Sequence, residues 1–151
     1  MIRRPLLVAL LLAVPAITPV LVSGLAPVLA AAGDPRRDAL LAEYAGQAKA
    51  QDAAFAAFSA ARGEALYRAT SSGGDARTPS CSACHGSDPR QPGRNAKTGR
   101  PIDPVAVSAN PLRFTDRATV EKHFARDCRS VLGRECTALE KGDYIAFLAA
   151  Q

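Results

Sequence analysis

The stretch Cys81-Ser82-Ala83-Cys84-His85 decides the fold of this chain. Two thiols separated by two residues, with a histidine directly after the second, form the attachment signature of a c-type haem. On one turn of helix both sulfurs can reach the vinyl groups of a porphyrin and form thioethers. The imidazole of His85 then lies under the iron as the proximal ligand. The motif therefore predicts one covalent haem c, held by Cys81, Cys84 and His85.

Two other interpretations use the same thiols. A C-x-x-C pair can be half of a zinc site, for which Cys128 and Cys136 could supply the other two thiolates. It can also be a dithiol redox pair, but such pairs lie near a βαβ pattern, which this sequence lacks. The adjoining histidine and the export signal described next favour haem over both.

The N-terminus has the pattern of an export signal. Arg3 and Arg4 form a charged start, and an uncharged, mostly apolar run follows from residue 6 to residue 32, ending in Ala30-Ala31-Ala32. The run is long enough to span a bilayer. Its three prolines, however, would disrupt a spanning helix. We therefore predict a signal peptide over residues 1–32, cleaved after Ala32.

The charge balance limits the possible partners. The chain has 19 basic and 14 acidic residues and a formal net charge of +5. Arg3 and Arg4 lie in the predicted signal peptide and every acidic residue follows it, so the mature chain would have 17 basic residues and a net charge of +3. The haem propionates would offset most of this charge. No nucleic-acid partner is expected from a chain so close to neutral.

The mature chain shows helix signals and no strand signals. Asp34-Pro35 reads as an N-cap before a helical N-terminal lead-in over residues 33–57. We assign residues 58–151 to a cytochrome c domain. Its first helix, Ser59 to Arg68, contains Gly63, which allows another helix to approach closely. Residues 86–111 are rich in proline and irregular, as expected of a segment that wraps a large apolar cofactor.

Two further helices complete the domain. Thr115 or Asp116 is the expected cap of a helix that runs to about Arg129. Thr137 and Glu140 form a capping box that opens the last helix, whose apolar stripe suits packing on the Gly63 helix. The prediction is an all-α, small cytochrome c-type fold, with short helices wrapped around one covalent haem.

Several segments together resemble one family more closely than the haem motif alone. The resemblance runs from about Arg62 to Gln151, and the segments that show it are Thr78-Pro79-Ser80-Cys81, Thr98-Gly99-Arg100, Asn110-Pro111, Arg113-Phe114-Thr115-Asp116, Val120-Glu121-Lys122 and Val131-Leu132-Gly133-Arg134-Glu135-Cys136-Thr137. They are similar to the sphaeroides haem protein (SHP)-like family of monohaem cytochromes c.

The resemblance implies a periplasmic cytochrome whose distal iron ligand is an asparagine that is released on reduction, so that oxygen or nitric oxide can bind. It also implies a disulfide in the distal region, for which Cys128 and Cys136 are suited. The implied redox partners are a dihaem cytochrome c and a b-type membrane cytochrome.

The sequence departs from the family at the distal ligand. The family pattern reads Arg-Asn-Cys with a tryptophan four residues before the asparagine, whereas this chain has Arg126-Asp127-Cys128 with His123 at the tryptophan position. An axial methionine is excluded, because the only methionine is Met1. His123 and Asp127 are four residues apart, so on a helix they share one face.

Three arrangements of the sixth iron position follow. His123 could bind the iron in a closed bis-histidine centre, or Asp127 could bind ferric iron as a hard carboxylate ligand that is lost on reduction. In the third, neither binds, and both side chains form a polar distal pocket. Without any distal role, His123 would be an exposed helix residue and Asp127 would pair with Arg126 or Arg129.

These alternatives separate two functions. We expect a periplasmic monohaem cytochrome for electron transfer with a labile or open distal site that binds oxygen or nitric oxide. The alternative is a closed bis-histidine electron carrier without ligand chemistry. In both cases we expect an electron carrier rather than an enzyme, and any reduction of oxygen or nitric oxide would be secondary.

Overall fold

The computed structural model of the chain describes residues 33–151. The predicted signal peptide and its cleavage site lie outside these residues. No helix within the described part is both long and apolar enough to cross a membrane.

Polar side chains set the starts of the long helices. Each N-cap accepts a hydrogen bond from a backbone N–H in the first turn, as expected of an N-cap. The four caps are Asp34 before α1 (Pro35–Gln51), Ser59 before α2 (Ala60–Arg68), Asp116 before α4 (Arg117–Leu132) and Thr137 before α5 (Ala138–Ala149). The capping box of Thr137 and Glu140 is confirmed.

Short elements occupy the middle of the chain. The single turn α3 (Ser82–His85) is followed by β1 (Gly93–Arg94) and β2 (Pro101–Ile102), which pair antiparallel with Gly93 opposite Ile102. The all-α class is confirmed, but the expectation of no strands is wrong at this one point. Two residues are too few to show the alternation of side chains by which a strand is recognised in sequence.

Within residues 33–151, the most extensive packing between two helices is that of α2 on α5. A Cβ atom added to Gly63 would collide with the backbone carbonyl of Asp143 and with the Cβ atom of Phe147, so only glycine allows this approach. Asp143 is buried and forms an ion pair with Arg62, with 2.7 Å between Nε of Arg62 and Oδ2 of Asp143. The predicted contact between the last helix and the Gly63 helix is confirmed.

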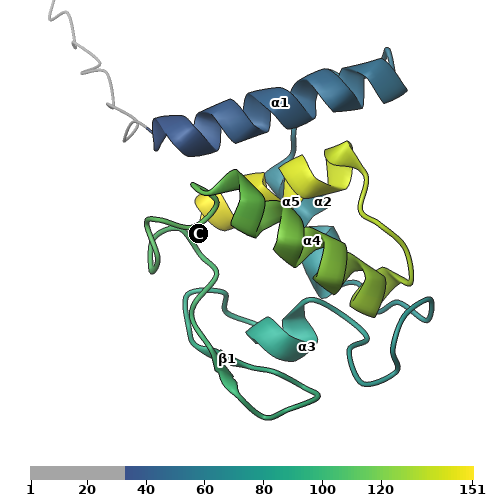
Figure 1. Cartoon of the computed structure of the whole chain (residues 1–151), viewed down its shortest axis with the longest axis vertical. Helices are drawn as coiled ribbons and strands as arrows, with labels where there is room; N and C mark the ends of the chain where they lie inside the picture. Colours follow the sequence, from purple (N-terminus) through teal and green to yellow (C-terminus); the bar gives the residue numbers. More distant parts are fainter. Residues whose placement is uncertain (1–32) are drawn as a thin grey trace, which may run out of the picture. The chain divides into compact units, whose positions relative to one another are not determined.

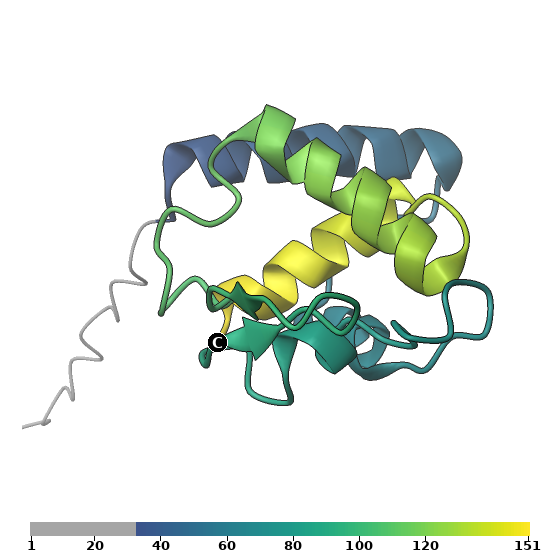
Figure 2. The same ribbon diagram turned by 60° about the horizontal axis from the view of Figure 1, so that its bottom comes forward.

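Helix α1 packs on the other helices along one buried face, formed by Leu40, Tyr44 and Ala48. The Tyr44 hydroxyl donates to Glu121 of α4 over 2.6 Å. Figures 1 and 2 show α1 on one side of α4 and α5, and α3 with the β1 segment on the other. The helix ends at Gln51, before the end of the helical lead-in predicted over residues 33–57.

The buried Arg37 ties α1 to a distant loop. Its guanidinium donates to the carbonyl oxygens of Pro111 and Arg113, at 2.6 and 3.1 Å. The chain from 111 to 113 leads directly into the N-cap of α4. Residues of the predicted lead-in therefore hold the segment that precedes α4.

Two glycine substitutions should have opposite effects on stability. We expect Gly63→Ala to lower the free energy of unfolding by about 1–3 kcal/mol, because α2 and α5 must move apart. Gly46 lies inside α1 with open space around its Cα. Gly46→Ala should raise stability by about 1 kcal/mol through helix propensity alone. Chemical denaturation of the holoprotein measures both changes. A Gly63→Ala protein as stable as wild type would contradict the packing.

A disulfide joins Cys128 of α4 to Cys136 before α5, with a sequence separation of 8. In the chain-entropy model, closing such a loop stabilises by about 2.6 kcal/mol. We expect the double variant Cys128→Ser/Cys136→Ser to lose about this free energy of unfolding in denaturant titrations. A thiol reductant should cause the same loss in wild type and none in the variant. Equal stability of wild type with and without reductant would contradict the expectation.

Candidate functional site

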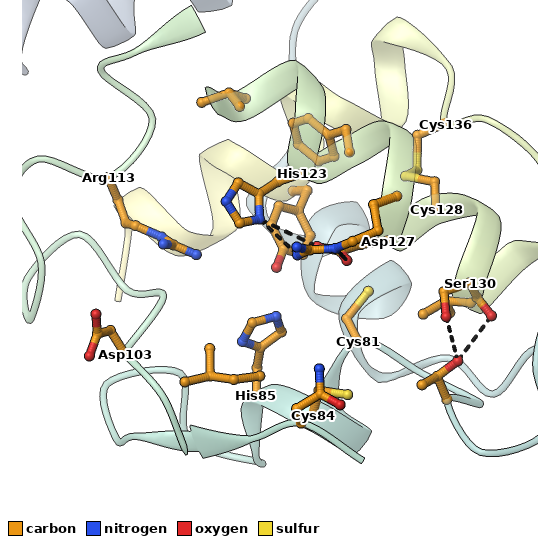
Figure 3. A pocket seen from close by; sticks show the side chains of 18 of the residues that line it. Cys81, Cys84, His85, Asp103, Arg113, His123, Asp127, Cys128, Ser130 and Cys136 are labelled. Atoms are coloured by element: carbon orange, nitrogen blue, oxygen red, sulfur yellow. Dashed lines mark hydrogen bonds and ion pairs between the residues drawn. A yellow bond between two sulfur atoms is a disulfide. The ribbon is translucent and has the colours of Figure 1, made fainter. Parts of the chain in front are cut away.

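A large cavity separates α3 and the β1–β2 segment from α4. Its volume is about 840 Å³, within the range of sites that bind cofactors. Cys81, Cys84 and His85 line one side, and His123 and Asp127 line another. Figure 3 shows the His85 ring rising from α3 toward His123 and Asp127. The structure thus brings all five predicted haem-site residues to one cavity.

The turn that presents His85 is built by local hydrogen bonds. The backbone N–H groups of Cys84 and His85 both donate to the carbonyl of Cys81, at 3.2 and 3.1 Å. Gly86 ends the turn with a φ of 78°, a conformation that glycine adopts without strain. Gly93 packs so closely on the Cys84 carbonyl that no Cβ atom would fit between them. The β1 strand therefore packs directly against the backbone of the haem-binding turn.

His85 has the properties of a metal ligand. Its Nδ1 atom is buried and has no hydrogen-bond partner in the described part of the chain, which is uncommon for a buried polar atom. Burial lowers the pKa of His85 to about 4, to which the nearby charge of Arg113 contributes. The ring is therefore neutral at physiological pH, and neutral imidazole is the form that binds metals.

The cysteines distinguish between the three interpretations of the motif. Cys128 and Cys136 are bonded to each other, so they cannot complete a zinc site with Cys81 and Cys84. Burial raises the pKa of the Cys81 thiol to about 11, with a further contribution from Asp127. Redox-active dithiols have lowered pKa values instead. Two free thiols and a neutral histidine on one turn of a large cavity fit a covalently held haem.

The α4 side of the cavity carries a group of polar residues, His123, Arg126 and Asp127, beside apolar residues such as Phe124 and Val131. The Arg126 guanidinium contacts both carboxylate oxygens of Asp127, with Nε–Oδ1 at 2.6 Å and Nη2–Oδ2 at 3.0 Å. The same Nη2 atom lies 2.8 Å from Nδ1 of His123. Of the two ion pairs considered for Asp127, the structure shows the one with Arg126, whereas Arg129 pairs with Glu135. Burial lowers the pKa of His123, and the charge of Arg126 lowers it further.

Three cavity residues were not singled out as site residues from the sequence. Arg113 reaches into the cavity beside His85 and His123, and its Nε atom is buried without a partner among the described residues. Phe114 and Tyr144 line the cavity and meet edge to face. Phe114 has a φ of 63°, a rare left-handed conformation for a bulky residue. A backbone conformation of this kind has no signal in the sequence.

Comparison with known proteins agrees with this geometry. A family described as "Domain of unknown function (DUF1924)" matches residues 53–148. The cytochrome c-type protein SHP of Cereibacter sphaeroides is 48% identical over 122 residues, which cover 81% of this chain and 89% of that protein. The fold and the site define a small monohaem cytochrome c. The chain belongs to the SHP family of these cytochromes, and its cofactor is haem c.

Solved structures show the same fold. The structure described as oxidized SHP, an oxygen binding cytochrome c, has a TM-score of 0.69 and 47% identity, covering 76% of this chain and 96% of that chain. The solution structure of cytochrome c'' from Methylophilus methylotrophus, described as giving insights into haem-ligand detachment, has a TM-score of 0.66 and 28% identity. It covers 78% of this chain and 94% of that chain.

Replacing His85 tests the proximal assignment. The chain has two histidines, and His123 lies across the cavity from His85. We expect His85→Ala to lose the ferrous absorption spectrum of the wild type, because no other imidazole lies on the α3 side. His123→Ala is the matched control and should keep a proximal histidine ligand. If His85→Ala retained the wild-type ferrous spectrum, the proximal assignment would be wrong.

Proposed function

We propose that this chain is a periplasmic monohaem cytochrome c that transfers electrons and whose distal position admits small ligands such as oxygen or nitric oxide. The observation that carries the proposal is the group of polar residues on the α4 side of the cavity, opposite His85. There, His123 and Asp127 are hydrogen-bonded to their helix neighbour Arg126. The description of SHP as oxygen binding supports the same function.

The proposed roles of the residues follow from their positions. Cys81 and Cys84 form the thioethers, and His85 is the proximal ligand. The bound haem supplies one-electron chemistry and a position for a sixth ligand. Burial keeps His85 neutral, while His123 and Asp127 form the distal pocket. Arg113 adds a positive charge beside the cavity that suits the negative propionates of a haem.

The export signal expected in residues 1–32 supports a periplasmic location, and so does the disulfide, since such bonds persist in oxidising compartments. We further propose a dihaem cytochrome c and a b-type membrane cytochrome as redox partners. This follows from the family resemblance. Reduction of oxygen or nitric oxide would be secondary to electron transfer.

A closed bis-histidine electron carrier is the second candidate. Its support is the position of His123, which lines the cavity on the side that His85 faces. The two candidates differ in one property, the availability of the sixth position in the reduced protein. The solution structure of cytochrome c'' from Methylophilus methylotrophus is described as giving insights into haem-ligand detachment, and this supports the labile site.

The absorption spectrum of the holoprotein decides between them. We expect a ferrous spectrum that shifts when carbon monoxide is added. The reason is that Arg126 is hydrogen-bonded to both His123 and Asp127, which leaves the sixth position open. The measurement compares ferric and ferrous protein, with and without the gas. A low-spin ferrous spectrum that is indifferent to carbon monoxide would contradict an open site and point to His123 as the sixth ligand.

A further inference from the structure

Arg126 contacts both of the side chains that could bind the iron from the distal side. It lies three residues after His123, which makes the two side chains neighbours on the helix surface. Its long side chain also reaches Asp127, the next residue in the chain. Its distances to the two partners lie between 2.6 and 3.0 Å. The three residues form a hydrogen-bonded group that we call the distal triad.

Arg126 hydrogen-bonds to both carboxylate oxygens of Asp127. Nε of Arg126 lies 2.6 Å from Oδ1, and Nη2 lies 3.0 Å from Oδ2, which is bidentate geometry between two partly exposed side chains. In a carboxylate held in this way, one lone pair of each oxygen is occupied and the negative charge is shared with the guanidinium, which weakens it as a metal ligand. Asp127 is therefore a poor iron ligand for as long as Arg126 is in place.

The contact also determines which nitrogen of His123 carries the proton. Guanidinium groups have donors only, so Nδ1 of His123 must be the acceptor of the 2.8 Å hydrogen bond from Nη2. In a neutral ring the proton then lies on Nε2. A histidine binds a metal through a nitrogen lone pair, so this tautomer offers Nε2 as a hydrogen-bond donor and not as a ligand.

We propose that Arg126 keeps both distal side chains off the iron and holds His123 as a hydrogen-bond donor for a small ligand in the distal pocket. The inference rests on the proposed open site and names the residue that maintains it. It also predicts the class of ligand that is favoured. Oxygen accepts a hydrogen bond in such a pocket, whereas carbon monoxide accepts one weakly, so the triad favours oxygen over carbon monoxide.

The test is Arg126→Gln, with Arg129→Gln as the matched control. Arg129 lies on the same helix, is exposed, and pairs with Glu135 away from the cavity. In Arg126→Gln we expect slower carbon monoxide binding to the ferrous protein and a rise of the low-spin fraction, because His123 is free to bind the iron. The affinity for oxygen relative to carbon monoxide should fall about tenfold, the effect of one lost hydrogen bond. Arg129→Gln should match wild type in all three measurements.

A double variant identifies the ligand that Arg126 restrains. Arg126→Gln/His123→Ala should recover fast carbon monoxide binding, while its relative affinity for oxygen stays low because the donor is gone. If wild type binds carbon monoxide and Arg126→Gln behaves identically, the proposed role of Arg126 is wrong and the proposed function remains intact. Wild type that does not bind carbon monoxide would overturn both.

Discussion

The dominant constraint on this fold is that the cavity between α3 and α4 must be enclosed by a small chain. The turn α3, which lines one side of this cavity, is contacted by both α2 and β1. The Tyr67 hydroxyl of α2 donates to the Gly86 carbonyl over 2.7 Å, and Gly93 presses on Cys84 from the β1 side. The proximal half of the site is therefore positioned by elements distant in sequence that meet on one helical turn.

The distal half depends on a different principle. His123, Arg126 and Asp127 all belong to α4, so their mutual contacts are made within one helix. Substitutions among these residues can change the chemistry of the site without moving a helix. The comparison with SHP is consistent with this, because the fold is shared at a TM-score of 0.69. Asp127 and His123, by contrast, depart from the expected family pattern of asparagine and tryptophan.

Much of the fold could be predicted from the sequence, because it depends on local chemistry. Asp34 and Thr137 cap helices wherever they occur before a helical stretch, and the closely packed Gly63 indicates a helix crossing. What could not be predicted depends on contacts across the fold. Nothing in the sequence marks Arg37 as a buried residue, yet it is buried and donates to two loop carbonyls. The sequence suggested Arg126 as a partner of Asp127, but its contact with His123 depends on a rotamer.

The packing of α1 has a consequence for where this domain begins. The family model starts at residue 53, after α1 has ended at Gln51. The hydrophobic core nevertheless includes Leu40, Tyr44 and Ala48 from that helix, together with residues of α4 and α5. The segment that the family model matches is thus smaller than the unit that folds, whereas the similarity to SHP extends over 122 residues. A chain shortened to the family boundary would leave an apolar face of α5 and the carbonyls held by Arg37 open to water.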